Sequence, residues 1–348
     1  MPTRDALNSV CLGGDTKRRT APRRVRPDPA RPLPCTREPH PLRIRPATLV
    51  WIWVAQGIGG ASPALTKLAL DGLGPFGLVV ARQILGAFFL IALAALPRRW
   101  RGESSVATHA RWTRRDLLLL LTLSWIGFAL PQILGAVGLE RSSATHGALL
   151  SPLEPIGILL GAAFVLRESL GLAHLIAGAF GIAGTVLIVV SSAGDARTGD
   201  LRGDLLIAAG HLCWAIYTLA AKPLVDRHDP LRVAIFAALL SWIPLVPLAA
   251  TESFDATRAL PALGWVLLLA FLATAMGMVA WNRALREVSA STMALFVFVQ
   301  PVVGLAIGVV ALGERVGWWA ILGAALIVQG VAIATLRGER AANGGEIV

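Results

Sequence analysis

Two ionisable side chains lie near the centres of long apolar stretches, where a charge is unfavourable. Glu154 falls within 144–166 and His211 within 203–222. An ionised carboxylate at the centre of a membrane helix costs about 2.5 to 3.5 kcal/mol even on the lenient insertion scale, so something must offset that cost. Glu154 predicts either a site for a substrate amine or a proton, or a protonated carboxyl that satisfies a neighbouring helix. For His211 alone, a neutral imidazole bonded to a carbonyl in a packed helix is the more ordinary interpretation.

Three prolines lie beside polar residues of these stretches. Pro152 and Pro155 flank Glu154, and Pro301 follows Gln300. Each proline removes an amide donor and interrupts the helical hydrogen bonds, so nearby carbonyls need a cavity or a partner. The three prolines are therefore predicted hinges.

The sequence contains an internal repeat. Residues 139–189 align with 285–335 at an offset of 146, which places Pro155 on Pro301. Further upstream the offset becomes 155, and the difference matches a longer loop in the first half. Such a repeat indicates two copies of one structural unit.

The repeat also relates four polar residues. At an offset of 146 Glu154 matches Gln300, and at an offset of 155 Gln56 matches His211. Each matched pair has one titratable side chain and one neutral amide. We expect these four side chains to form a polar site near the middle of the membrane, asymmetric in charge.

Three larger side chains complete the predicted site. Trp214 and Tyr217 follow His211 on the same stretch and are expected to form amphipathic walls. Arg82 lies roughly two turns inside the second apolar stretch and can pair with Glu140 or with a substrate carboxylate. Because its counterpart is Ala237, the structural pairing is the favoured interpretation.

Other polar residues have ordinary structural interpretations. Gln132, His146 and Asn282 are lesser candidates, each more typical of a hydrogen bond between helices. Glu168 and Glu314 occupy matching turns and are expected to cap the next helix or to hold a short loop.

Two pairs of glycines have the spacing that allows helices to approach closely. They are Gly157 with Gly161, and Gly304 with Gly308. The close approach can lie within one monomer or across a homodimer, and the spacing fits both.

Ten apolar stretches must position these residues. Each has about the length at which a helix spans a ~30 Å hydrocarbon core. They are 47–69, 75–96, 116–139, 144–166, 170–190, 203–222, 231–250, 262–284, 290–312 and 316–336. Their length and continuous apolarity exclude barrel strands. The sequence predicts an all-α integral membrane protein with ten transmembrane helices. Five helices per repeat, an odd number, give two inverted repeats, 47–190 and 203–336.

The composition agrees with a membrane protein. Of the 348 residues 55% are hydrophobic and only 15% charged, which excludes most soluble folds. Much of the net charge of +11 lies in residues 1–46, rich in Arg and Pro, which we expect to be a disordered cytoplasmic tail. This charge does not predict nucleic-acid binding. The three cysteines have no metal-binding or CxxC spacing, so no metal site or cofactor is predicted.

The distribution of Lys and Arg predicts the orientation. If the tail is cytoplasmic, the loops on its side hold more Lys and Arg than the opposite loops. Both termini, including the tail 337–348, are therefore expected in the cytoplasm. The predicted location is a plasma membrane of the bacterial inner-membrane type.

These residues resemble those of EamA-type transporters of the drug/metabolite transporter superfamily. The resemblance rests on Arg82, on 151–155 followed by Glu168, and on 300–301 followed by Glu314. It implies a plasma-membrane carrier of small organic molecules such as amino acids, metabolites or drugs, with both termini inside and no bound cofactor.

Three functions remain open from the sequence. The first is a secondary carrier, an exporter, that works by alternating access in contact with the lipid bilayer. The second is a membrane-embedded enzyme that uses Glu154 and His211 as acid and base on a lipid-soluble substrate, although no catalytic signature supports it. The third is a sensor or scaffold, which would need a cytoplasmic output domain. The chain is expected to be a monomer or a homodimer.

Overall fold

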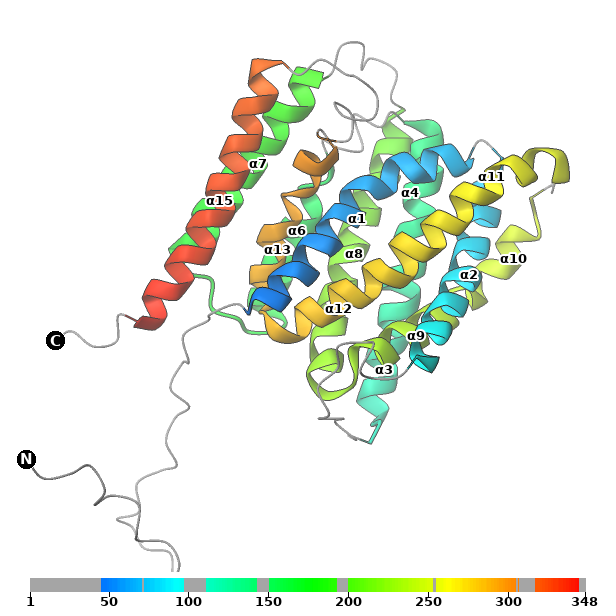
Figure 1. The fold of residues 1–348 in the computed structure, drawn as a ribbon, viewed down its shortest axis with the longest axis horizontal. Helices are drawn as coiled ribbons and strands as arrows, with labels where there is room; N and C mark the ends of the chain where they lie inside the picture. The colour runs from blue at the N-terminus through cyan, green and yellow to red at the C-terminus, as the bar shows by residue number, and fades with distance from the viewer. Residues whose placement is uncertain are drawn as a thin grey trace, which may run out of the picture. The chain divides into compact units, whose positions relative to one another are not determined.

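The computed structural model of the chain describes eight segments, namely residues 45–70, 72–96, 111–142, 150–192, 200–252, 255–304, 306 and 317–343. These segments are helical apart from short turns and caps, and no strand occurs in them (Figure 1). The predicted tail up to residue 44, His146, Gly308 and Glu314 lie outside the described residues.

The helices and helical segments follow the order of the predicted stretches. They are α1 Pro46–Leu70, α2 Pro75–Ala95, α3 Arg114–Thr122, η2 Leu123–Ala129, α4 Leu130–Arg141, α6 Leu153–Phe164, α7 Leu172–Ser192, α8 Leu201–Arg227, α9 Pro230–Ser241, η3 Ile243–Leu245, α10 Val246–Ala249, α11 Ala256–Leu269, η4 Ala270–Met276, α12 Gly277–Glu287, α13 Ala290–Val297 and α15 Trp318–Asn343.

Five helical runs in the described part are long and apolar enough to cross a membrane. They are Pro75–Ala95, Arg114–Arg141, Leu201–Arg227, Pro230–Ala249 and Ala256–Glu287. Every predicted stretch contains a described helix. The all-α membrane class is therefore confirmed, whereas the count of ten crossings remains a prediction.

The outer surface of the helices carries large apolar side chains. Phe88, Leu118, Leu205 and Leu260 are each 62 to 69% exposed. A surface of this kind in water would be an aggregation liability. Hydrocarbon chains of a bilayer can cover it at no such cost.

Two helix interruptions lie four residues before a proline, although Pro63, Pro223 and Pro261 lie inside continuous helices. In a regular helix a proline ring clashes with the carbonyl four residues earlier. Ser151, four residues before Pro155, begins the turn that precedes α6, and α13 ends at Val297, four residues before Pro301. The two interruptions lie at the predicted offset of 146. Their role as moving hinges remains a prediction.

Two π-helical segments occupy matching positions. Each of η2 and η4 is seven residues long and lies inside a continuous helical run, α3–η2–α4 or α11–η4–α12. π-Helical segments are rare in proteins, and many of those that occur lie at functional sites. The sequence pattern carried no indication of these segments.

Packing between helices also obeys the repeat. A Cβ added to Gly157 would lie 2.9 Å from the Cβ of Ala215, and one added to Gly60 would lie 2.8 Å from the Cβ of Val303. Gly157 matches Val303 at the offset of 146, and Gly60 matches Ala215 at the offset of 155, so the two contacts are equivalent under the repeat. The packing of α6 against α8 is thus repeated in the packing of the segment after α13 against α1. Gly161 likewise faces Leu219 of α8. The close approach of this glycine pair therefore lies within one chain.

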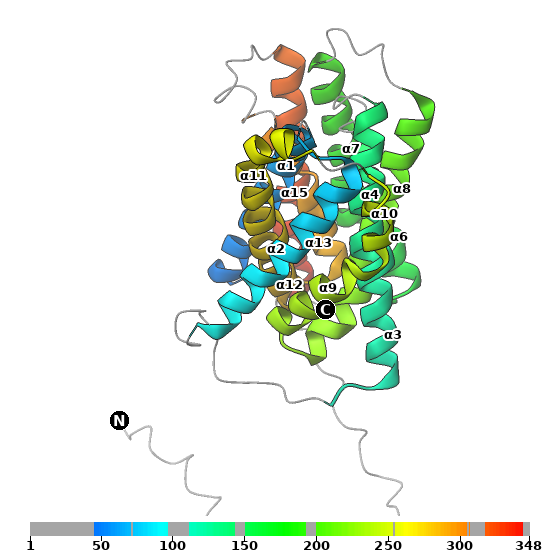
Figure 2. The ribbon, with the colours of Figure 1, turned by 90° about the vertical axis from the view of Figure 1, so that its right-hand side faces the viewer.

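Helices α7 and α15 form an antiparallel pair in which the backbones touch. A Cβ on Gly184 would lie 2.5 Å from the carbonyl oxygen of Gly323, and one on Gly330 would lie 2.9 Å from that of Ala177. Gly184 and Gly330 are 146 residues apart, and so are Ala177 and Gly323, so the two contacts are equivalent under the repeat. Both views show the two helices side by side (Figure 1 and Figure 2).

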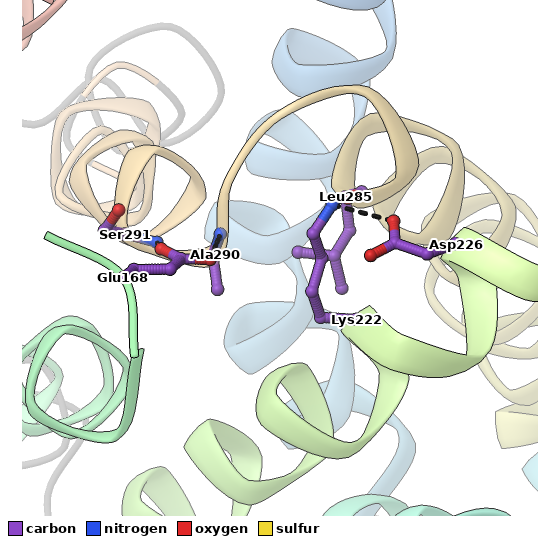
Figure 3. Close-up of polar contacts among 6 residues, drawn as sticks. All are labelled: Glu168, Lys222, Asp226, Leu285, Ala290 and Ser291. Carbon is purple, nitrogen blue, oxygen red and sulfur yellow. Dashed lines mark hydrogen bonds and ion pairs between the residues drawn. The ribbon is translucent and has the colours of Figure 1, made fainter. Parts of the chain in front are cut away.

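Glu168 joins the two halves of the chain. The backbone N–H groups of Ala290 and Ser291, at the start of α13, each donate to its carboxylate over 2.9 Å (Figure 3). The sequence predicted that Glu168 caps the next helix or holds a short loop. Instead it caps a helix of the other half, because the chain fold brings that helix start beside the turn after α6.

A second polar contact lies nearby. Lys222 of α8 donates over 2.9 Å both to Asp226 and to the carbonyl oxygen of Leu285 (Figure 3). This contact ties the end of α8 to the end of α12.

A third polar cluster joins α3 to the end of α8. Asp116 is buried, closes a capping box with Thr113 and accepts a hydrogen bond of 2.8 Å from Arg227. His228 Nε2 lies 3.3 Å from Asp116, and its ring stacks on Trp112 with 3.8 Å between the centroids.

Candidate functional site

Gln56 of α1 and Gln300 form the first polar pair. Gln300 Nε2 donates to Gln56 Oε1 over 2.9 Å, and Gln56 is fully buried. The missing side chain of Gly59 makes room, because a Cβ there would lie 2.6 Å from Gln300 Nε2. Gln56 Nε2 has no hydrogen-bond partner among the described residues.

Glu154 and His211 form the second pair. Glu154 lies in the first turn of α6, where the helix dipole favours a negative charge, and it is 5% exposed. Its Oε2 lies 3.5 Å from Nδ1 of His211 on α8, and the His211 side chain is 25% exposed. The ordinary interpretation of His211, bonded to a carbonyl, is replaced by this contact with a carboxyl. Glu154 Oε1 has no hydrogen-bond partner in the described part of the chain.

The two pairs are counterparts under the repeat. In the repeat alignment Glu154 matches Gln300 and His211 matches Gln56, so the Glu154–His211 contact is equivalent to the Gln300–Gln56 contact. Each contact joins one residue of the first half to one of the second. The same position in the fold thus holds a titratable pair once and a pair of neutral amides once.

Aromatic rings continue the face of α8 that carries His211. Trp214 stacks on Tyr217 with 4.9 Å between the ring centroids and an interplanar angle of 7°. Phe128 and Trp281 lie 5.9 and 6.2 Å from the Trp214 ring. The spacing of three residues from His211 to Trp214 and on to Tyr217 keeps these side chains on one side of the helix.

Asn282 of α12 fastens this aromatic cluster. Tyr217 Oη donates to Asn282 Oδ1 over 2.9 Å, and both residues are fully buried. Asn282 Nδ2 and Trp281 Nε1 are buried without a hydrogen-bond partner in the described segments. Buried polar atoms are normally satisfied, so these two donors distinguish the aromatic cluster from an ordinary apolar core.

Arg82 does not contact Glu140. The buried guanidinium donates from Nε to Thr274 Oγ1 over 2.9 Å and from Nη1 to Gln132 Oε1 over 2.7 Å. The predicted pairing with Glu140 is therefore wrong. Gln132 forms a hydrogen bond between helices, as expected for that residue.

Sequence reasoning missed Thr274, Phe128 and Trp281. They lie in apolar runs whose composition gives them no special character. Only a residue's position around its helix, together with the π-helical segments, brings them to the polar residues.

Among the described residues, no group of three or more His, Cys, Asp or Glu is arranged to hold a metal ion.

Comparisons with known proteins agree with the repeat and with the helical architecture. The sequence model of the EamA-like transporter family matches twice, over residues 47–190 and 201–336, which confirms that the chain contains a repeat. A crystal structure of another protein has a TM-score of 0.67 at 20% identity, covering 85% of this chain and 99% of the other, so the two share a fold.

The similar proteins are named as transporters. A probable terminal-alkyne amino-acid exporter of Streptantibioticus cattleyicolor is 30% identical over 292 residues, which cover 83% of this chain and 93% of that protein. The uncharacterized transporter YyaM of Bacillus subtilis is 26% identical over 227 residues, 64% of this chain and 74% of that protein. The chain belongs to the EamA-like transporter family, and it is a multi-pass membrane transporter of small molecules rather than an enzyme.

Proposed function

We propose that the chain is a secondary carrier that exports small amine-bearing organic molecules, amino acids among them, across the plasma membrane. In this proposal ten transmembrane helices form two inverted halves, 47–190 and 203–336, and both termini lie in the cytoplasm. The 30% identical relative named as an amino-acid exporter supports this substrate class.

One observation carries the proposal. A buried carboxyl group, Glu154, faces an imidazole of the other half and keeps one oxygen without a partner among the described residues. Such a carboxyl can take up a proton or pair with a cationic amine, and either event neutralises the net charge of the site during a transport cycle. The side chain of His211, which faces this carboxyl, is 25% exposed.

The placement of this carboxyl beside a helix interruption supports alternating access as the proposed mechanism. Glu154 lies three residues after Ser151, where the turn before α6 begins, and Gln300 directly follows the turn at 298–299. In the proposed cycle the helix halves rotate about these turns. Each rotation would close the site formed by the two polar pairs to one side of the membrane and open it to the other.

Polar contacts join the halves on both sides of the proposed membrane. On the outer side the N–H groups of Phe76 and Gly77 donate to Glu252, and Ser142 donates to Asp204.

The inner side has contacts of the same kind. Glu168 with the start of α13, and Asp116 with Arg227, lie next to loops that the proposed topology places inside. Opening toward the cytoplasm would require these contacts to break.

The test is counterflow in proteoliposomes that contain the purified protein. Vesicles loaded with an unlabelled amino acid should accumulate the labelled form, and an imposed pH gradient should change the rate if a proton is coupled. Protein-free vesicles are the control. No accumulation for any of the common amino acids would remove amino acids as the proposed substrate class.

A further inference from the structure

We propose that Arg82 binds the carboxylate of the transported molecule, which makes this carrier selective for carboxylate-bearing substrates. This inference rests on the proposed function and specifies its substrate class.

The guanidinium of Arg82 is buried and its charge is uncompensated. It is 5% exposed, and both of its hydrogen-bond acceptors, a hydroxyl and an amide oxygen, are neutral. Among the described residues no carboxylate forms an ion pair with it. A buried cation of this kind is expensive in a membrane protein and indicates a functional anion.

The geometry leaves donors for a second partner. A guanidinium carries five N–H bonds in one plane, and Arg82 uses two of them in the contacts with Thr274 and Gln132. The planar fork matches the two oxygens of a carboxylate, and such bidentate pairs are among the strongest hydrogen-bonded contacts. The two neutral contacts hold the fork in place without neutralising it.

The surroundings of Arg82 belong to both halves and are irregular in both. Thr274 lies in the π-helical segment η4 of the second half, and Gln132 lies three residues after η2 of the first half. Gly86, one turn after Arg82, brings α2 against η4, because a Cβ there would overlap the methyl group of Thr274. A ligand on Arg82 would therefore contact the point where the two halves meet.

Arg82 also breaks the internal symmetry. Its counterpart at the offset of 155 is Ala237, which is fully buried. The sequence alone favoured a structural pairing with Glu140 on this ground, but the contacts of Arg82 are with Thr274 and Gln132 instead. The asymmetry is therefore compatible with a binding role in one half alone.

The experiment measures thermal unfolding of the purified full-length protein with each common L-amino acid, with the matching amino-acid amide and with sodium chloride. Wild-type protein should be stabilised by at least one amino acid and much less by its amide, in which the carboxylate is replaced. Arg82→Gln should bind that amino acid about tenfold or more weakly and lose the preference over the amide. Arg82→Lys, which keeps the charge but loses the fork, should recover part of it.

Arg258→Gln is the matched control, because Arg258 is an exposed arginine whose side chain is 78% accessible. It should leave the preference unchanged. Equal stabilisation by amino acid and amide, no stabilisation by any amino acid, or the same stabilisation by chloride would overturn the inference. The wild-type comparison can overturn the preference for carboxylates even if one Arg82 variant fails to fold, and the other variant then tests whether Arg82 provides that preference.

Counterflow separates this inference from the proposed function. If amides compete with amino acids equally well in proteoliposomes, the carrier function stands and the role of Arg82 is wrong. If counterflow is absent, the carrier function fails, while the preference for carboxylates is still measured by binding.

Discussion

At the scale of single residues, the position of Glu154 accepts a neutral side chain elsewhere in the same fold. Its counterpart Gln300 makes an amide contact with Gln56 where the carboxyl of Glu154 lies 3.5 Å from His211. The carboxyl is therefore not required for packing at this position. What distinguishes Glu154 is its ability to exchange a proton or to hold a cation.

Glu154→Gln should preserve folding and abolish most of the transport. We expect an unfolding temperature at or above that of the wild type, because the variant removes a buried ionisable group. Transport should fall about tenfold or more, or lose its dependence on the pH gradient. Counterflow rates at two pH gradients, together with the amount of protein in the membrane, measure both effects.

Gln300→Glu is the control for this variant. It places a second acid at the matching position and should be tolerated poorly unless that acid is protonated. If Glu154→Gln transports at the wild-type rate with unchanged pH dependence, Glu154 is a structural residue and the proposed site is wrong.

At the scale of elements, two glycines of one helical run differ in whether another helix packs against them. A Cβ on Gly127, in η2, would lie 2.6 Å from the Cα of Tyr217, whereas a Cβ on Gly135, in α4, would meet nothing within 4 Å. Both glycines lie in the same helical run, so their intrinsic helix propensities are nearly matched. Contact with α8 separates their expected effects.

Gly127→Ala should destabilise the protein by about 1 to 3 kcal/mol, because the added methyl group forces α8 away. Gly135→Ala should stabilise it by roughly 0.5 to 1 kcal/mol, because alanine loses less backbone entropy in a helix. Unfolding temperatures in one detergent test both. Equal shifts for the two variants would contradict the packing of η2 against Tyr217.

At the scale of the whole molecule, the proposed topology makes a prediction about the loops. A reporter that is active only in the periplasm should be active when fused after Ser192 and silent when fused after Ala107, since the positive-inside rule places these loops on opposite sides. Reporter activity in cells measures this, with expression level as the control. The reverse pattern would discard the inward termini and the proposed orientation of the two halves.

The sequence by itself determined the class of the protein and much of its plan. Apolar stretches long enough to span a bilayer, the repeat at offsets of 146 and 155, and the prolines at the helix interruptions were all readable, because hydropathy and proline chemistry are local properties. Glu154, His211, Gln56 and Gln300 stood out for the same reason: polar atoms are conspicuous in an apolar run.

Only the tertiary structure decided which residues meet. Alignment of the repeat matches Glu154 with Gln300, yet the contacts join Glu154 to His211 and Gln56 to Gln300. Residues in matching positions of two copies are equivalent by symmetry, whereas a contact depends on how the copies face each other. Arg82 shows the same limit, because its partner Thr274 is 192 residues away. Such contacts depend on how each helix is rotated about its own axis, and the π-helical segments change this rotation locally. Local composition does not predict that rotation.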